Sequence, residues 1–149
     1  MKAGRVQPPT CLLVSIAVMA LLDSLAPVSE FARYPWNLLG VIPLLAGIVL
    51  NLSADAAFRR ARTTVKPFET STTLITDGVF RISRHPMYLG MVLILLGIAV
   101  LMGVVAPLPV VAAFAVLMDR VYARKEERML SARFGPAWDA YRNRTRKWV

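Results

Sequence analysis

Two short polar motifs at the edges of apolar stretches carry the residue types that could do chemistry. The first, Arg84-His85-Pro86-Met87-Tyr88, directly precedes an apolar stretch, and the second, Glu126-Glu127, shortly follows another. Pro86 suits the first position of a helix, which places His85 at a helix entrance, where unpaired backbone N–H groups favour an electron-rich group. Adjacent carboxylates can accept hydrogen bonds from hydroxyl or amino groups and can stabilise a cation in a partly dry site.

Each motif alone also has a structural explanation. His85 could cap a helix, Arg84 could anchor a membrane edge, and Glu126-Glu127 could form salt bridges on a solvated helix. Other kinds of site are excluded by the residue inventory. One histidine and one cysteine, Cys11, leave no multi-histidine or cysteine-based metal centre and no internal disulfide. The sequence contains no Ser/His/Asp or Cys/His arrangement for covalent catalysis.

The composition places these motifs in a membrane protein. Of the 149 residues, 56% are hydrophobic and only 18% are charged, whereas soluble chains have roughly 25% charged residues. The sequence predicts an all-α integral membrane protein with a single membrane domain over residues 1–149. About four transmembrane helices are expected, at residues 10–28, 36–57, 87–102 and 108–123. The polar segment 124–149 predicts an amphipathic interfacial helix that is interrupted at Gly135-Pro136.

The basic residues predict the orientation of these helices. If both termini are cytoplasmic, 17 of the 18 lysines and arginines fall on the cytoplasmic side, and only Arg33 falls outside. A large cytoplasmic loop then runs from Arg59 to Pro86, and two short turns lie outside. An alternative is that the first segment is a signal peptide. Its removal would place that basic loop outside, against the positive-inside rule.

A net charge of +9 would suit binding either to nucleic acid or to an anionic membrane surface. The basic residues border apolar segments, and no nucleic-acid-binding module is present, so we expect contact with anionic lipid headgroups of the bilayer and no nucleic acid. The sequence leaves the oligomeric state open. Glycines in the second and third apolar segments, such as Gly40, Gly47, Gly90 and Gly97, would permit close helix contacts, either within one chain or between chains.

The order of the motifs resembles that of the isoprenylcysteine carboxyl methyltransferase and phospholipid methyltransferase superfamily. Lys66-Pro67 is followed by Thr-x-Gly-x-x-Arg at residues 76–81, by Arg-His-Pro-x-Tyr-x-Gly at 84–90, and by an apolar hairpin. Glu-Glu-x-x-Leu at 126–130 and Phe-Gly-x-x-x-x-x-Tyr at 134–141 complete the pattern. The resemblance covers residues 66–149. The family often has Gly-Pro-Tyr where this chain has Gly78-Val79-Phe80, so the contact of this loop with a substrate is expected to differ.

The resemblance implies a membrane enzyme that uses S-adenosylmethionine, bound on the cytoplasmic side of what we expect to be a bacterial inner membrane. The cytoplasmic loop and the C-terminal interfacial helix would form the cofactor site. The implied catalytic residues are Glu127 and Arg133, the latter to orient an anionic acceptor. The implied cofactor-binding residues are His85, Pro86, Tyr88, Leu89, Gly90, Glu126 and Glu127.

The acceptor and two alternative functions remain open from the sequence. The acceptor is expected to be lipophilic, an isoprenylcysteine-type carboxylate, a lipid amine or a thiol. A membrane reductase that uses NADPH is one alternative, because sterol reductases carry a similar His-Pro-x-Tyr segment and a late Gly-x-x-Trp-x-x-Tyr, which here falls at residues 135–141. A non-catalytic lipid-binding membrane scaffold is the other.

Overall fold

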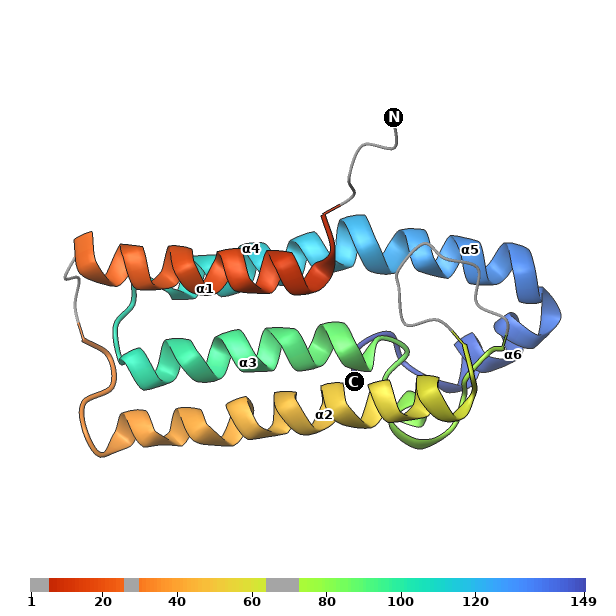
Figure 1. Ribbon diagram of the computed structural model, residues 1–149, viewed down its shortest axis with the longest axis horizontal. Coiled ribbons are helices and arrows are strands. Elements are labelled where there is room, and N and C mark those ends of the chain that lie inside the picture. The colour runs from red at the N-terminus through yellow and green to blue at the C-terminus, as the bar shows by residue number, and fades with distance from the viewer. Residues whose placement is uncertain (1–5, 26–29, 64–72) are drawn as a thin grey trace.

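The computed structural model describes residues 6–25, 30–63 and 73–149, most of which form helices (Figure 1). This described part contains no β-strand, only an isolated bridge between Glu30 and Val104, and the predicted all-α class is confirmed. The elements, in chain order, are α1 Pro8–Leu25, the 3-10 helix η1 Trp36–Gly40, α2 Val41–Arg60, the 3-10 helix η2 Gly78–Arg81, α3 Pro86–Met102, α4 Leu108–Leu117, the π-helical segment η3 Met118–Ala123, α5 Arg124–Phe134 and α6 Pro136–Arg144.

Helices α1 to α4 run alongside one another, roughly along the long axis of the molecule (Figure 1). Helices α4, η3 and α5 follow one another without a gap, so that one continuous helix extends from Leu108 to Phe134. No proline or glycine interrupts this run after Pro109. It ends at Gly135, whose positive φ of 48° is readily adopted only by glycine. The expected interfacial segment therefore begins as an extension of the fourth apolar helix, and the chain turns only at Gly135-Pro136.

Within the described ranges, two helices are long and apolar enough to cross a membrane. They are Pro8–Leu25, with 18 residues, and the continuous η1–α2 helix Trp36–Arg60, with 25 residues. Helix α3 is apolar but has 17 residues, and the apolar helix α4 has 10. A membrane context is supported by the first two helices, while the four-span arrangement stays a prediction.

Helix α3 packs more extensively against α2 than against any other described helix, and glycines allow the two backbones to approach closely. A Cβ added at Gly97 would lie 2.6 Å from the backbone nitrogen of Leu44 and 2.7 Å from the carbonyl oxygen of Gly40. Because these neighbours are backbone atoms, they cannot swing aside as a flexible side chain would. Gly47 and Gly90 make a second contact of this kind along the same pair. The glycines singled out in the sequence are thus used within one chain.

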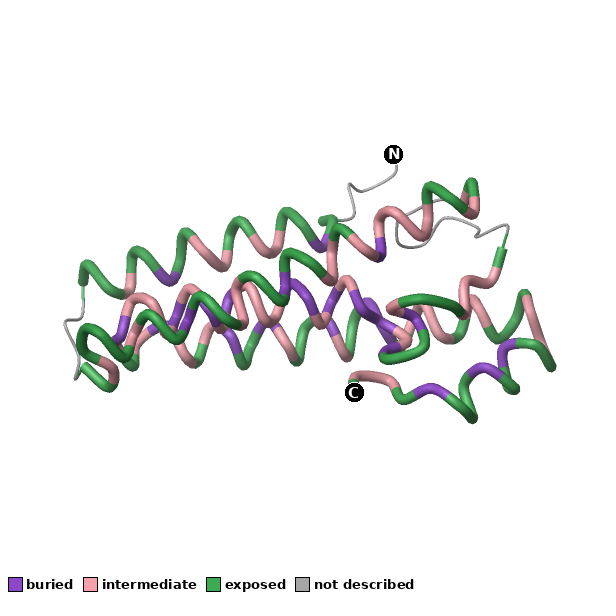
Figure 2. The backbone as a smooth tube through the Cα atoms, turned by 90° about the horizontal axis from the view of Figure 1, so that it is seen from below, coloured by how far each residue is buried: buried purple, intermediate pink, exposed green. Residues whose placement is uncertain are grey.

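The buried side chains form two groups, visible as purple stretches along the middle of the bundle and at the α6 end (Figure 2). The first group joins α1, α3 and α4 through residues that include Met19, Leu95 and Phe114. The second group joins α2, η2 and α6 at the other end of the molecule, and its buried members are Ala54, Phe80, Trp138 and Tyr141. This second group supports the loop that precedes α3 and thereby positions the first polar motif.

The two turns expected outside the membrane meet in the structure. The backbone N–H of Phe31 donates to the carbonyl oxygen of Gly103 over 2.8 Å. These turns therefore lie at one end of the bundle, and the polar motifs lie at the other. Part of the expected cytoplasmic loop, including Lys66-Pro67, lies outside the described residues, as do Lys2 and Arg5.

Candidate active site

The N-terminus of α3 positions the first motif. Pro86 is the first residue of the helix, as its lack of an N–H favours, so His85 stands at the N-cap position. His85 does not cap the helix with its side chain. Its backbone N–H donates instead to Oγ of Ser83 over 3.1 Å, and Ser83 Oγ donates to the carbonyl oxygen of Lys147 over 3.1 Å. The imidazole is thereby left to point away from α3.

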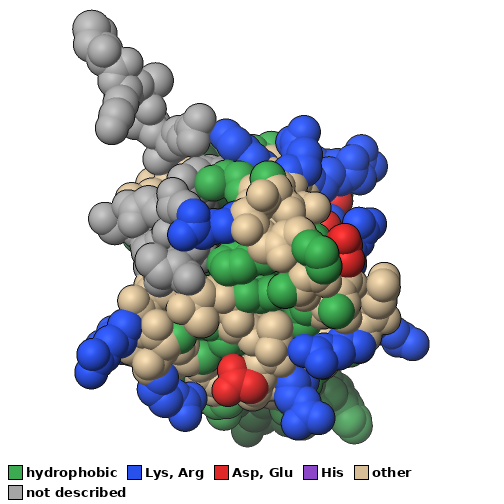
Figure 3. All heavy atoms as spheres, turned by 90° about the vertical axis from the view of Figure 1, so that its right-hand side faces the viewer, with side chains coloured by type: hydrophobic (Ala, Val, Ile, Leu, Met, Phe, Trp, Pro, Cys, Tyr) green, Lys and Arg blue, Asp and Glu red, His purple; other side chains and the backbone are tan. Residues whose placement is uncertain are grey.

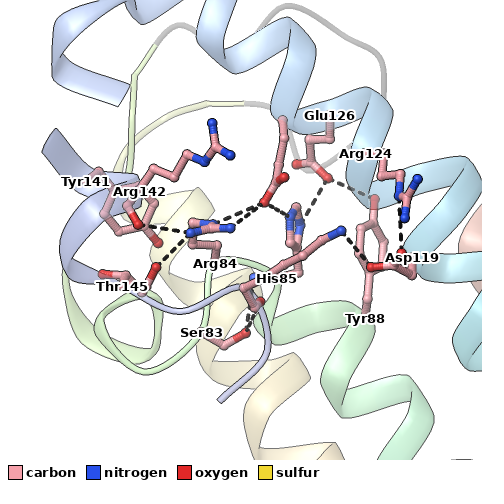
Figure 4. A network of polar contacts seen from close by, with 12 residues as sticks. Ser83, Arg84, His85, Tyr88, Asp119, Arg124, Glu126, Tyr141, Arg142 and Thr145 are labelled. Carbon is pink, nitrogen blue, oxygen red and sulfur yellow. Dashed lines mark hydrogen bonds and ion pairs between the residues drawn. The ribbon is translucent and has the colours of Figure 1, made fainter. Parts of the chain in front are cut away.

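The imidazole of His85 lies between the two glutamates of α5 (Figure 4). Its Nε2 is 3.2 Å from Oε1 of Glu127, and its Nδ1 is 3.7 Å from Oε2 of Glu126. The hydroxyl of Tyr88 donates to Oε2 of Glu126 over 3.0 Å. Nε and Nη2 of Arg84 both lie 3.0 Å from Oε1 of Glu127. The structure thus brings together the two motifs that the sequence separates by some forty residues.

Each glutamate uses only one oxygen in this cluster. The contacts of Glu127 with Arg84 and His85 converge on Oε1, and those of Glu126 with Tyr88 and His85 converge on Oε2. Across the described ranges, Oε2 of Glu127 and Oε1 of Glu126 have no hydrogen-bond or ion-pair partner. The cluster therefore fixes both carboxylates and keeps one acceptor on each for a ligand.

The cluster shifts the ionisation of its members. Burial favours neutral His85, but the hydrogen bonds and charges of Glu126 and Glu127 outweigh this and raise the pKa of His85 above its ordinary value. Burial would also raise the pKa of Glu127. Here the hydrogen bonds and charges of His85 and Arg84 prevail and lower this pKa to about 2. Glu127 is thus held as a carboxylate at neutral pH, although only 19% of its side chain is exposed.

The segment after α6 supports the cluster from another side, and sequence reasoning missed it. Nη1 of Arg84 donates to the carbonyl oxygens of Arg142, over 3.0 Å, and Thr145, over 2.8 Å. The backbone N–H of Arg84 donates to the carbonyl oxygen of Arg146 over 3.1 Å. Nζ of Lys147 donates to Oδ1 of Asp119 over 2.6 Å, which ties this segment to η3. These are mostly contacts with backbone carbonyls, which no side-chain pattern in the sequence reveals.

An apolar cavity of about 220 Å³ opens beside the cluster. Its polar wall consists of Gln7, Arg84, His85, Tyr88 and Glu126. Its apolar wall comes from the start of α1, the end of α2, η2 and the first turns of α3, through Pro8, Pro9, Phe58, Phe80, Pro86, Met87 and Met91. The arrangement offers a carboxylate acceptor and aromatic faces next to an apolar surface, a combination that suits a cation with an apolar body.

The remaining predicted site residues lie around this cavity or outside it. Leu89 is half-buried and Gly90 packs against α2, and neither lines the cavity. Arg133 is exposed near the end of α5, where its guanidinium lies 5.9 Å from the ring centre of Phe134. It has no polar contact with the cluster among the described residues. Phe80, which replaces the tyrosine common in the family, is buried, and its carbonyl oxygen accepts a 2.6 Å hydrogen bond from Tyr141.

Comparison with known proteins identifies the family. No curated protein and no solved structure matches the chain. A family model described as phospholipid methyltransferase matches residues 36–137, a region that runs from η1 to α6 and contains both polar motifs. Membership of this family indicates a methyltransferase that acts on lipid-type substrates. The protein belongs to the phospholipid methyltransferase family, within the membrane methyltransferase superfamily that the order of its motifs indicated.

Proposed function

We propose that this protein transfers a methyl group from S-adenosylmethionine to a lipophilic acceptor at the cytoplasmic face of a membrane. One observation carries the proposal: Glu126 and Glu127 are fixed around His85, and each keeps one free oxygen beside a cavity. A polar cluster that served only to join α3 to α5 would have no need of free acceptors. The family match supports the reaction class.

The residues around the apolar cavity fit the chemistry of this methyl donor. Its sulfonium is a cation with an apolar surround, for which Glu126 and the faces of Tyr88, Phe58 and Phe80 provide charge attraction and cation–π contact. Its ribose hydroxyls and ammonium are hydrogen-bond donors. The free oxygen of Glu126 in this cavity can accept from them, and so can that of Glu127, which lies beside the cavity in contact with His85. We propose His85, Pro86, Tyr88 and these two glutamates as the cofactor-binding set, with Leu89 and Gly90 supporting them from α3.

The reaction needs alignment more than a reactive side chain. When bound, S-adenosylmethionine would supply an already activated methyl group for a lone pair of the acceptor, and its sulfur would keep the electron pair of the broken bond. Glu127 would hold the donor, and the apolar walls would exclude water and align the acceptor with it. An amine acceptor also loses a proton, whereas a carboxylate acceptor does not; Arg133 would orient the latter.

The proposed topology places both termini and the cluster in the cytoplasm, with α1, η1–α2, α3 and α4 crossing the membrane. The distribution of basic residues supports this orientation, and so does the meeting of the two outer turns at the end opposite the cluster. The acceptor would then enter from the bilayer, and the donor from the cytosol.

Binding of S-adenosylhomocysteine to purified protein in detergent tests the proposal. We expect saturable binding that Glu127→Ala weakens, while Glu30→Ala, at the opposite end, does not. NADPH should fail to compete. Incubation of membranes with labelled S-adenosylmethionine should then yield a labelled lipid that disappears in the Glu127→Ala variant. Folded protein that binds no S-adenosylhomocysteine would contradict the proposal, and competition by NADPH would favour a reductase.

A further inference from the structure

A second cavity, of about 520 Å³, lies between α5 and α6 and shares no lining residue with the apolar cavity. Its lining is mainly basic. Glu127 and Ser131 contribute from α5 and Trp138 from α6, and the remaining four residues are arginines: Arg120, Arg124, Arg128 and Arg142. With four guanidiniums against one carboxylate, the lining carries a net charge of +3.

The continuous helix from α4 to α5 explains how three of these arginines come together. Arg120, Arg124 and Arg128 follow one another at intervals of four residues, so they succeed each other along one side of the helix. Arg142 lines the same cavity from α6, which the turn at Gly135 folds back beside α5 (Figure 1). Basic side chains surround this end of the molecule, as seen in Figure 3.

The charges in this cavity are only partly neutralised. Asp119 lies 3.3 Å from Nε of Arg124 and 3.9 Å from Nε of Arg120, but it also pairs with Lys147 over 2.6 Å. The guanidiniums of Arg128 and Arg142 have no ion pair or hydrogen bond within residues 6–25, 30–63 and 73–149. Two guanidinium groups, each with five N–H donors, therefore face the cavity and have no acceptor among the described residues.

We propose that this cavity binds the phosphate of a membrane lipid headgroup. Guanidiniums bind phosphate oxygens in a bidentate manner, and two or more of them can share one group. The cavity begins where the apolar stretch of α4 ends, at Leu117, which is the level of headgroups if this end faces the membrane surface as in the proposed function. The sulfonium of the methyl donor is a poorer match for these arginines, because the excess positive charge would repel it. Glu127 lies between the two cavities: it lines this one and contacts His85 of the apolar cavity, so it can bind the donor from there.

Titration of the purified full chain in dodecyl maltoside, a detergent without phosphate, tests this assignment. The probe is dihexanoylphosphatidylglycerol, and dihexanoylglycerol serves as the phosphate-free comparison. The wild type should bind the first probe and not the second. Arg128→Gln/Arg142→Gln should raise the Kd for the phospholipid by at least about tenfold, the loss expected for charge-assisted hydrogen bonds. The single variant Arg128→Gln, on an exposed side chain, should give part of this loss and guards against misfolding of the double variant.

The matched control is Arg60→Gln/Arg144→Gln, which removes the same charge from exposed residues that do not line this cavity, and it should bind the phospholipid like the wild type. Equal binding of dihexanoylglycerol, equal binding of inorganic phosphate, or an unchanged Kd in the double variant would each overturn the lipid-phosphate site. A parallel loss of S-adenosylhomocysteine binding would also overturn it and would assign the cavity to the cofactor. If the wild type binds no S-adenosylhomocysteine but the phospholipid contrast persists, the proposed function fails and this site stands.

Discussion

The two halves of α3 are held in place by different means. From Gly90 to Gly97 the helix approaches α2 closely because the glycines have no side chains. Backbone atoms therefore set the distance between the two helices. At His85 and Tyr88 the same helix is held to α5 by charged and hydrogen-bonded groups. The first contact involves no titratable group, whereas the second joins titratable groups and leaves carboxylate oxygens free. The close packing of α3 against α2 therefore fixes the position of the helix, and the polar contacts of its N-terminal end with α5 form the candidate ligand site.

The largest effect is expected from disrupting the glycine contact between α2 and α3. Gly97→Leu should destabilise the protein by about 3 kcal/mol or prevent folding, because the added side chain meets backbone of Gly40 and Leu44 that cannot move aside. Thermal unfolding and size-exclusion chromatography in detergent measure this. Ala112→Leu, which also introduces a leucine but at an exposed position of α4, is the control and should unfold like the wild type. A stable, monodisperse Gly97→Leu protein would contradict the close approach of α2 and α3.

Removing a charge from the polar cluster should lower the stability less than Gly97→Leu does, but it should strongly reduce methyl transfer. Glu127→Gln leaves Arg84 and His85 without their anion, which we expect to cost about 2 kcal/mol, less than a fully buried pair because the site is partly exposed. Methyl transfer should fall by about 100-fold, as for other losses of an aligned charged group. Rates with labelled S-adenosylmethionine and thermal unfolding give the two values. Equal activity in the variant and the wild type would exclude Glu127 from the reaction.

The two halves should also differ in their response to pH. The pKa of Glu127 is lowered from 4.5 to about 2, so its stabilising contribution is complete above the ordinary value and is lost as the pH falls towards 2. His85 acts in the opposite sense: its pKa is raised, so its contribution is complete below 6.5 and is lost as the pH rises through the folded value. The stability difference between wild type and Glu127→Gln should therefore shrink in acid. The difference caused by Gly97→Ala should stay constant, and a parallel acid dependence of the two would contradict this distinction.

The smallest effect is expected from the segment that follows α6. Lys147→Gln removes the ion pair with Asp119, whose side chain is 23% exposed, and should cost about 1 kcal/mol. Hydrogen exchange of the amide of Arg84, which donates to the carbonyl oxygen of Arg146, should become faster. Arg133→Gln, an equal loss of charge at an exposed position of α5, is the comparison. Unchanged exchange in the Lys147 variant would show that Asp119 does not hold this segment in place.

Local residue patterns predicted much of this molecule correctly. Apolar runs identified the helices, because a chain that buries its backbone in an apolar medium must satisfy its hydrogen bonds within a helix. Pro86 predicted the start of α3, because it lacks the N–H that the first turn cannot use. The interruption at Gly135-Pro136 also follows from local chemistry. The pairing of the two polar motifs followed from the hairpin between them, since antiparallel helices return to the same end.

The tertiary structure decided what the local pattern could not express. Which oxygen of Glu126 or Glu127 stays free depends on how α5 is rotated against α3, and a sequence does not state that rotation. The contacts of Arg84 with the carbonyl oxygens of Arg142 and Thr145 involve backbone, which every residue shares. The basic cavity arises only because α6 folds back beside α5 and brings Arg142 to the arginines of another helix. The sequence determined the helices, the two motifs and the family, and the packing of α5 and α6 decided which side chains share a cavity, because contacts between distant residues depend on geometry that no local pattern encodes.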